Sequence, residues 1–355
     1  MGWELAKFRR FLELAFCALL VANSGCARET QSYEIAGPQI PKSQATVLIY
    51  GKSDIDEIDA GIIRASHTSH AALAQFYRWF QHYEHADIPL NDHLLLLSPD
   101  ARFKTVSGDA VNVAAYQQQA SKVPNVWKNA HFVRKVNINV DEKASVRLDA
   151  DIVFVNRGAL EQNNIHAGQL HMHSILGKSE QEKMSNLPKI QEVMMNQSAF
   201  GEVDFFRSSY GENRLKSLLH YWLSLIENPD RKPEYFDSVL SEEFRTNFSD
   251  NLLTSNEGLR TWLAGPVGEG QAMHYRVRNV KIDSLGENKY SLVAEMDWYG
   301  LMNNGDQLSG RVNHVFAVID DFEKPFATIT AFQEDEILPA TLRPDEKDKK
   351  PRNPQ

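Results

Sequence analysis

Two stretches of the chain carry the same strand-like pattern, and this repetition limits the possible folds more than any other feature of the sequence. They read AHFVRKVNINVD from Ala130 to Asp141 and AMHYRVRNVKID from Ala272 to Asp283. Arg, Asn and Asp stand at the fifth, eighth and twelfth positions of both stretches. This repetition predicts a duplicated unit, in which each copy forms a domain with its own hydrophobic core.

Matching segments surround the two stretches in the same order. Apolar residues recur at helical spacing over Ala71–Glu84 and over Leu215–Glu227, which predicts two amphipathic helices. Alternating apolar and polar residues predict three further strands in each half. These strands cover Val146–Gly158, Ala167–Leu176, Pro188–Gln197, Tyr290–Gly305, Ser309–Ile319 and Pro325–Asp335. Helices followed by long strands predict an α+β fold, in which the helices cover one face of an antiparallel sheet.

The ends of the chain differ in composition from the two halves. A basic start and a short apolar run, Phe11–Ala22, predict an export signal over residues 1–26. The signal ends in NSGC, which resembles the lipobox of bacterial lipoproteins and implies a lipid anchor on Cys26, although Glu13 and Asn23 depart from that pattern. We therefore expect a periplasmic, membrane-anchored protein of the cell envelope, with ordinary secretion as the alternative. The other predicted parts are a tether over 27–65, domains over 66–200 and 201–338, and a disordered tail over 339–355.

Cysteine content and charge exclude several classes of site. The chain has two cysteines, Cys17 and Cys26, and both lie in or at the end of the predicted signal. The folded part should therefore contain no disulfide, thiolate metal site or cysteine nucleophile. A net charge of −9 without a long basic run argues against nucleic acid as a partner.

The order of these segments also resembles a known family. Each predicted first helix ends in an acidic step (Glu84–Asp87 and Glu227–Asp230), and the chain closes on the pattern NHVFAVID…ITAFQED. Over residues 66–336 this order is similar to the nuclear-transport-factor-2-like (NTF2-like) superfamily, which includes SnoaL-like polyketide cyclases, ketosteroid isomerase and scytalone dehydratase. The resemblance implies two tandem cone-shaped domains, each with N-terminal helices packed on a curved antiparallel sheet, that form a pseudo-dimer within one chain. It implies no cofactor, and it does not by itself decide the function, because the fold hosts enzymes, binders and scaffolds.

Steroid-isomerase chemistry does not fit the residues at the positions that the resemblance points to. Trp79 and Trp222 stand where the isomerases have a phenolic Tyr on the first helix. Thr105 stands where they have the catalytic base, and Met172 and His314 correspond to the acid of the oxyanion hole. Since all three roles are altered, we expect a different activity or none.

A second pattern of the superfamily is kept in the first half. Dehydratase- and cyclase-like members pair an acidic residue at the end of the first helix with a His that opens the first long strand, and Glu84 and His131 stand at these places. With Tyr77 on the same helix, such a pair could abstract and return a proton. The alternative is structural: Glu84 caps a turn and His131 lies at a strand edge. In the second half the repeat aligns Met273 with His131 and puts His274 on the opposite strand face.

The remaining polar residues indicate no metal site. His171 and His173 share a strand face but supply only two ligands, and the helix-spaced pairs His67/His70 and His82/His85 have no third ligand nearby in the sequence. The paired acids Asp149/Asp151 and Glu295/Asp297 alternate with apolar residues, so we expect them on the surface.

Three functions therefore remain open from the sequence. The first is binding of a small apolar or aromatic molecule in the cone cavity; the second is a cofactor-free lyase or isomerase that uses Glu84, His131 and Tyr77; the third is a non-catalytic scaffold. The grouping of these polar residues in the first half favours a single working pocket. The residues expected to line the cavities are Trp79, Phe80, Phe154, Met172, Trp222, Trp298, His314 and Phe316.

Overall fold

The chain folds into two compact units. The computed structural model describes residues 47–48, 58–104, 110–141, 144–159, 164–177, 187–230, 232–248, 251–264 and 270–343. The first unit is built from Gln75–Asn213 and the second from Gln44–Ala74 with Arg214–Gln355. Each contains helices and one sheet, which confirms the α+β prediction. Cys26, the predicted signal, most of the tether and most of the predicted tail lie outside the described residues. Among the described helices, none has the length and hydropathy of a membrane span.

Helix α2 (Ala60–Glu84) is longer than its sequence pattern predicts. It begins just after Asp59, whose side chain accepts a hydrogen bond from the backbone N–H of Gly61 at 2.6 Å. The first turn of α2 therefore lies within the segment that we expected to be a tether. This turn has little apolar periodicity, because a capped helix start can form from small and polar residues. The division between the two units also falls inside α2, between Ala74 and Gln75.

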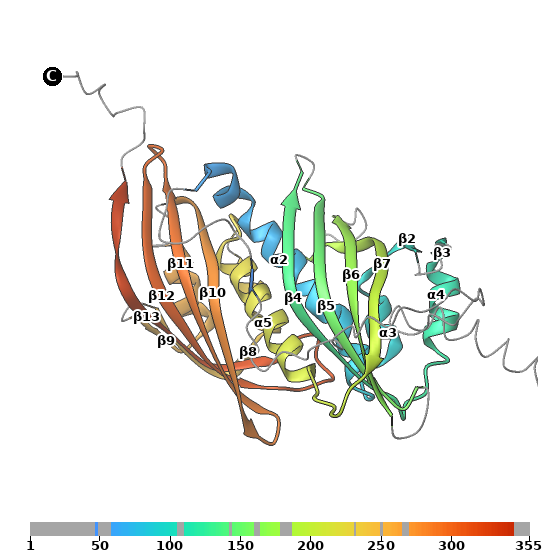
Figure 1. Ribbon diagram of the computed structural model, residues 1–355. Coiled ribbons are helices and arrows are strands. Elements are labelled where there is room, and N and C mark those ends of the chain that lie inside the picture. The colour runs from blue at the N-terminus through green and yellow to red at the C-terminus, as the bar shows by residue number, and fades with distance from the viewer. Residues whose placement is uncertain are drawn as a thin grey trace, which may run out of the picture. The chain divides into compact units, whose positions relative to one another are not determined.

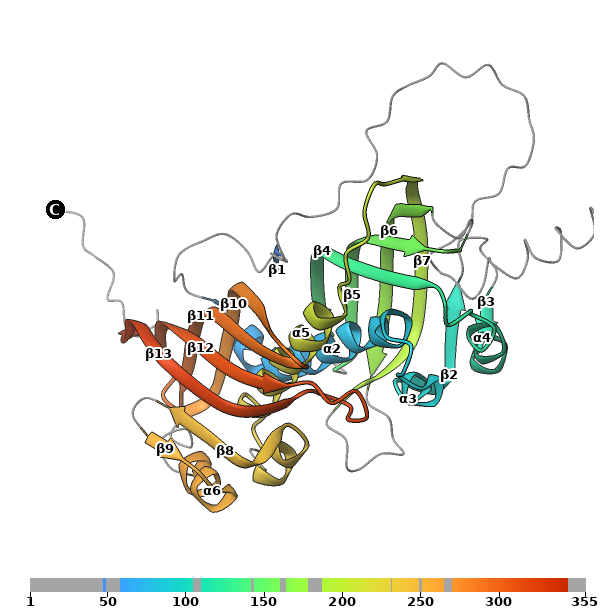
Figure 2. The same ribbon diagram turned by 90° about the horizontal axis from the view of Figure 1, so that it is seen from below.

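The first unit joins its helices to a mixed sheet (Figure 1). After α2 come two short helices, α3 (Leu90–Leu94) and α4 (Val113–Ala120), and α4 contacts β2 and β3, as Figure 2 shows. The sheet order is β4-β5-β6-β7-β2-β3. Neighbouring strands are antiparallel except β2 and β7, which are parallel. The strands are β2 (Leu97–Lys104), β3 (Ala110–Asn112), β4 (Lys128–Val140), β5 (Val146–Arg157), β6 (Ile165–Gly177) and β7 (Lys189–Glu202), and a two-residue strand, β1 (Val47–Leu48), precedes them in the chain.

The second unit has the same strand order in its own sheet. The order is β10-β11-β12-β13-β8-β9, and β8 and β13 are its parallel pair. Its helices are α5 (Tyr210–Ile226), the 3₁₀ helix η1 (Pro233–Ser238) and α6 (Asn256–Ala264). Its strands are β8 (Leu240–Phe248), β9 (Asn251–Leu253), β10 (Gly270–Gly286), β11 (Lys289–Met302), β12 (Gln307–Ile319) and β13 (Thr328–Arg343).

Each of the predicted antiparallel sheets therefore also contains one parallel pair of strands. No strand pattern is present in the sequence of β2, which contains Pro99 and Asp100, or of β8, which contains Glu242 and Glu243. These residues are rare in strands and interrupt the apolar alternation on which a strand prediction depends. Both strands form because a neighbouring strand, β7 or β13, supplies hydrogen-bond partners along its edge.

Aromatic side chains fill the core of each unit. In the first unit Trp79 stacks on Phe103 and Tyr116, with ring centroids 6.1 and 5.7 Å apart. In the second unit Trp222 packs against three rings at 4.9–5.9 Å, those of Phe236, Phe316 and Phe332. Edge-to-face and offset pairs of this kind stabilise a core beyond the area that they bury.

A β-bulge corrects the alignment of the two halves. One irregularity lies between Val133 and Lys135 in β4, and another lies between Val277 and Asn279 in β10. His131 pairs with Phe154 across its bulged pair of strands, whereas Tyr275 pairs with Trp298. The residue equivalent to His131 is therefore Tyr275, not Met273, and the equivalent of His274 is Ala130. The alignment of the two stretches by identical residues is therefore wrong by two residues. A shift of two residues keeps every side chain on the same face of the strand.

One of the predicted surface acids is buried. The side chains of Asp149 and Asp151 are 43% and 57% exposed, as expected, but that of Asp297 is fully buried. Asp297 accepts hydrogen bonds from Arg276, Arg278 and Arg311, at 2.6, 2.9 and 2.8 Å. Burial acts to raise the pKa of Asp297, but the three guanidinium groups outweigh it and the pKa is lowered. The prediction failed because long Arg side chains on the flanking strands β10 and β12 cover this face of β11.

Candidate functional site

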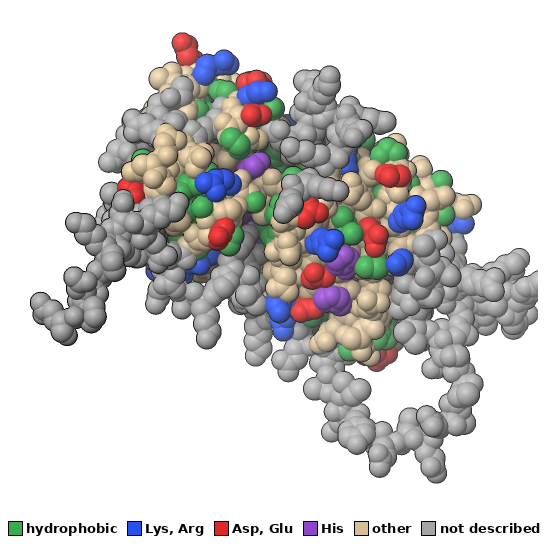
Figure 3. Space-filling model, turned by 90° about the horizontal axis from the view of Figure 1, so that it is seen from above, with side chains coloured by type: hydrophobic (Ala, Val, Ile, Leu, Met, Phe, Trp, Pro, Cys, Tyr) green, Lys and Arg blue, Asp and Glu red, His purple; other side chains and the backbone are tan. Residues whose placement is uncertain are grey.

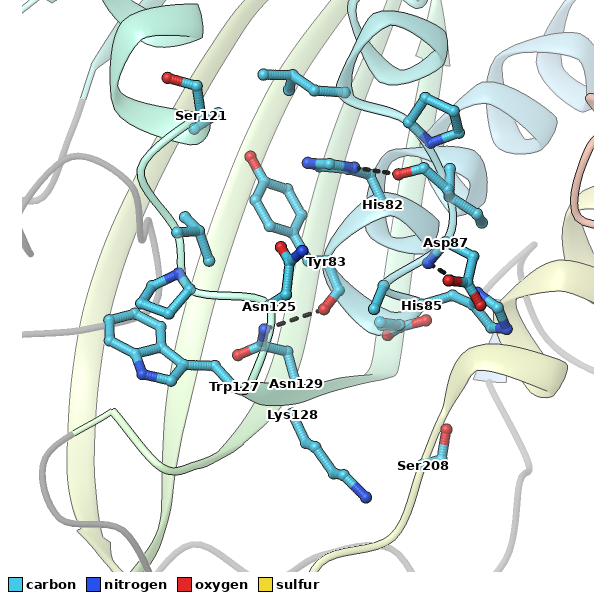
Figure 4. A pocket seen from close by; sticks show the side chains of 18 of the residues that line it. His82, Tyr83, His85, Asp87, Ser121, Asn125, Trp127, Lys128, Asn129 and Ser208 are labelled. Atoms are coloured by element: carbon cyan, nitrogen blue, oxygen red, sulfur yellow. Dashed lines mark hydrogen bonds and ion pairs between the residues drawn. The ribbon is translucent and has the colours of Figure 1, made fainter.

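A pocket of about 710 Å³ opens in the first unit at the C-terminal end of α2 (Figure 4). Three segments line it: residues 82–90, residues 120–129 (without Lys122 and Val126), and Phe206 with Ser208. Two hydrogen bonds hold the first two segments in place. His82 Nδ1 donates to the carbonyl of Ile88 at 2.8 Å, and Asn129 Nδ2 donates to the carbonyl of Tyr83 at 3.0 Å. The pocket is therefore built from loops and from the ends of α2, α4 and β4, which meet only in the folded unit.

The lining of this pocket is polar as well as aromatic. Tyr83 and Trp127 contribute rings, and Lys128, His85 and Asp87 contribute groups that carry or can carry charge. Burial lowers the pKa of His82, although its hydrogen bond to Ile88 acts in the other direction. A neutral His82 that donates from Nδ1 has a lone pair on Nε2, so this ring can accept a hydrogen bond from a ligand.

The structure brings Glu84 and His131 together, and Glu84 also lines the pocket. Glu84 Oε1 lies 3.1 Å from Nδ1 of His131, and the His131 ring stacks on Phe80 at 4.9 Å. Tyr77, the third residue predicted to be catalytic, is fully buried and packs edge-on against Phe76. The roles of these three residues in catalysis stay a prediction.

The carboxylate of Glu84 already accepts hydrogen bonds from backbone and side-chain donors. Its Oε1 accepts from the backbone N–H of His131 at 2.9 Å, from Ser209 Oγ at 2.6 Å and from Asn213 Nδ2 at 2.8 Å. Asn213 also donates to the carbonyl of His131 at 2.9 Å. These contacts satisfy the peptide groups of β4 at His131, so the observed arrangement gives Glu84 a structural task.

Replacement of Glu84 tests this structural task. Glu84→Ala is expected to lower the free energy of unfolding by about 1–3 kcal/mol, because buried donors of His131, Ser209 and Asn213 lose their acceptor. Glu84→Gln keeps one acceptor oxygen and should cost less. Urea unfolding measures both, and Asp87→Ala, an exposed acid of the same pocket, is the control with a change within about 0.5 kcal/mol. Equal stability of Glu84→Ala and Asp87→Ala would contradict the assignment.

The second unit repeats this arrangement with different side chains. Glu227 accepts from the backbone N–H of Tyr275 at 2.6 Å and from Ser66 Oγ at 2.5 Å. His70 Nε2 donates to the carbonyl of Tyr275 at 3.0 Å, the task that Asn213 has in the first unit. The sequence does contain a signal for this match, because Ser66 and His70 have the same four-residue spacing as Ser209 and Asn213. Strand alternation and apolar helix positions, on which the repeat prediction depends, do not reveal this polar spacing.

His274 joins Glu227 and His70 in this buried group, contrary to the expectation that His70 has no third ligand nearby. Ligand atoms of the three side chains all lie within 4.8 Å of one another. Burial raises the pKa of Glu227 to about 7 and lowers the pKa of His274 to about 3. Burial also lowers the pKa of His70, although Glu227 acts to raise it, and lowers that of His220 well below its usual range.

The eight residues predicted to line the cone cavities do not line the described pocket. Trp298 is half-buried and the other seven are buried. His314 lies 2.9 Å from Glu334 through its Nε2 atom. Their role as ligand contacts stays a prediction. The structure buries seven of them in packed cores: Trp79, Phe80, Phe154 and Met172 in the first unit, and Trp222, His314 and Phe316 in the second.

No protein-family model and no curated relative matches the sequence. Solved structures align with part of the chain. One, described as a candidate aromatic ring hydroxylase from Novosphingobium aromaticivorans, is 11% identical, with 39% of this chain and 96% of that chain covered and a TM-score of 0.35. A hexachlorocyclohexane dehydrochlorinase of type 3 from Novosphingobium barchaimii is 8% identical, with 38% and 90% covered and a TM-score of 0.33. Nuclear transport factor 2 from Cryptosporidium parvum is 8% identical, with 38% and 99% covered and a TM-score of 0.31.

Proposed function

We propose that the chain consists of two tandem NTF2-like domains, and that the first binds a small aromatic molecule with polar substituents in the pocket at the end of α2. The pocket itself is the observation that carries the proposal. Its volume of about 710 Å³ lies within the range of small-molecule sites, about 300–1,000 Å³. Rings of Tyr83 and Trp127 offer stacking surfaces, and His82 and Lys128 are polar residues of the same lining.

The tandem arrangement is supported by features that the two units share. Both sheets have the same strand order with one parallel pair at the same place. Both first long strands, β4 and β10, carry a bulge at the matching position, and both are held by a Glu from the end of a long helix. A duplication of one ancestral unit explains all of these matches.

The binding proposal is tested by native mass spectrometry of the tag-free protein purified from its own host. We expect a co-purifying small molecule that is lost on Trp127→Ala, because this ring lines the pocket. Trp298→Phe is the matched control, since Trp298 belongs to β11 of the second unit, and it should retain the molecule. An empty parent protein, or a molecule that survives Trp127→Ala, would refute binding at this pocket and favour the scaffold interpretation.

Acid–base catalysis at the same pocket is the second candidate function. It is favoured by the 3.1 Å contact between Glu84 and His131, since Glu84 also lines the pocket. In this candidate His131 moves the proton and Glu84 orients its ring, as carboxylates do beside catalytic histidines. Incubation of the co-purified molecule with His131→Gln should then show binding without a new product by chromatography, whereas the parent protein converts it. No conversion by the parent protein would exclude this candidate.

We also propose that the protein is exported and anchored to the membrane through a lipid on Cys26. The support comes from the sequence, because Cys26 lies outside the described residues. Fractionation of host cells should recover the parent protein with membranes and Cys26→Ser in a soluble fraction. Equal distribution of the two proteins would contradict a lipid anchor on this residue.

A further inference from the structure

A buried cluster of histidines surrounds Glu227 in the second unit. His70 comes from the first part of α2, His220 from α5 and His274 from β10. His70 Nε2 lies 3.5 Å from Glu227 Oε1, and His274 Nδ1 lies 3.7 Å from the same oxygen. The side chains of His70, His274 and Glu227 are at most 2% exposed. The pocket of the first unit contains none of these residues, so the cluster is a separate feature.

The first unit shows that the structural task of this cluster needs no histidine. Glu84 and Glu227 both accept the backbone N–H of the matching strand residue, and Ser209 and Ser66 both donate to that carboxylate. Where the second unit has His70 as donor to the strand carbonyl, the first unit has Asn213. His70 and His274 have hydrogen-bond partners in the structure, but the first unit makes the equivalent backbone contacts without an imidazole. The additional histidines of the second unit are therefore candidates for a further task.

A second difference between the two units also places a histidine beside Glu227. His274 occupies the strand position that corresponds to Ala130 in the first unit, as the bulges in β4 and β10 align them. A methyl group is sufficient at this position in the first unit. In the second unit an imidazole places Nδ1 2.5 Å from Ser66 Oγ and 3.7 Å from Glu227 Oε1. Both differences between the units thus add a nitrogen ligand beside the same carboxylate.

We propose that His70 Nε2, His274 Nδ1 and Glu227 Oε1 form a binding site for a divalent transition metal ion of the zinc type. Two imidazoles and one carboxylate are a common ligand set for this class of ion. The separations of 3.5 and 3.7 Å are close to the ligand–ligand distance of about 3.4 Å in a tetrahedron with bonds of about 2.1 Å. Ser66 Oγ lies 2.5 Å from His274 Nδ1 and 2.5 Å from Glu227 Oε2, so it hydrogen-bonds both side chains, and His274 Nδ1 exchanges this bond for the ion when metal binds.

The contact between His70 and His220 supports metal binding by His70. Their Nδ1 atoms are 2.9 Å apart, so one of the two must be protonated and the other must accept. In the structure Nε2 of His70 donates to the carbonyl of Tyr275, so metal binding must replace this bond: Nε2 then ligates the ion while Nδ1 donates to His220. A hydrogen bond from the second ring nitrogen is the usual way in which proteins orient a ligating histidine. His220 is therefore a positioning residue for this site.

The site would connect three elements of the second unit, namely the start of α2, the end of α5 and the edge strand β10. Its burial leaves no room for a substrate among the described side chains, so the task of the ion is structural. A site of this kind is loaded as the protein folds, and the bound ion stabilises the folded state.

The test uses the tag-free full chain, stripped with a chelator and then titrated with zinc. We expect about one zinc per chain by elemental analysis, and a visible absorption band of tetrahedral cobalt when Co²⁺ replaces zinc. The main variant is His70→Asn combined with His274→Ala, which gives the second unit the side chains of the first. This variant should fold, since Asn213 and Ala130 serve the same backbone, and its zinc affinity should fall by at least about 100-fold.

Two further variants separate the proposal from nonspecific binding by histidines. His171→Ala combined with His173→Ala removes histidines that lie beside Asp149 and Asp151 on the accessible face of β5 and β6, and it should leave the stoichiometry unchanged. His220→Tyr introduces the residue type of the matching position in α2, since Tyr77 stands seven positions before Glu84 as His220 stands before Glu227. This variant should weaken zinc binding about 10- to 100-fold. Absence of stoichiometric zinc in the parent protein, or equal zinc affinity in the folded His70→Asn/His274→Ala variant, would overturn the proposal.

Discussion

Arg214→Ala is expected to lower the free energy of unfolding of the second unit by about 3–5 kcal/mol. The side chain of Arg214 is 2% exposed, and its Nε atom donates to Asp320 at 2.8 Å. Its two terminal nitrogens donate to the carbonyls of Asp321, Lys324 and Pro325, each at 2.8 Å. Removal of the guanidinium leaves the Asp320 carboxylate buried without its cation and three turn carbonyls without their donor.

Urea unfolding followed by circular dichroism measures this effect. Arg214→Lys should recover only part of the loss, because an ammonium group cannot reach the same set of acceptors as a planar guanidinium. Lys281→Ala is the matched control, since Lys281 is 70% exposed and its ion pair with Asp283 is solvated. We expect a change below about 1 kcal/mol for this exposed pair. If Arg214→Ala unfolds at the same urea concentration as Lys281→Ala, the buried pair does not stabilise the unit.

Trp222→Ala is expected to destabilise the second unit by about 3–5 kcal/mol. Trp222 is fully buried, and its ring contacts Phe236, Phe316 and Phe332 at centroid distances of 5.4, 5.9 and 4.9 Å. Truncation to Ala removes these contacts and leaves a cavity that close-packed neighbours fill only in part. Because such a cavity is apolar, added indole or benzene should bind in it and restore part of the lost stability.

The same variant separates a packed core from a ligand cavity. Trp127→Ala, which removes a half-buried ring from the pocket of the first unit, is the comparison and should cost clearly less than Trp222→Ala. The measurement is thermal or urea unfolding with and without indole. If Trp222→Ala costs no more than Trp127→Ala and gains nothing from indole, the ring does not fill a core, and the sequence-based prediction of a ligand contact at Trp222 becomes the better interpretation.

The exposed acidic and histidine side chains agree with the alternation in the sequence. Figure 3 shows histidines among acidic and basic side chains on one face of the molecule. On β5 and β6, His171 and His173 pair with Asp151 and Asp149 at 3.0 and 2.8 Å. Alternation predicts such a face correctly when one side of the sheet is covered by apolar residues and the other by solvent. The alternation pattern failed for Asp297, because Arg276, Arg278 and Arg311 cover the strand face that was expected to meet solvent.

Local sequence patterns determined the α+β class and the positions of the two long helices and of most strands, whereas the pairing of Glu84 with His131 was implied by the resemblance to the NTF2-like superfamily. These features depend on periodicity and on the order of segments, which a sequence displays directly. Tertiary structure decided which residues of the two halves correspond, since the bulges in β4 and β10 align His131 with Tyr275. It also decided the pocket and the cluster around Glu227, because both assemble side chains from distant segments whose meeting depends on packing and strand register.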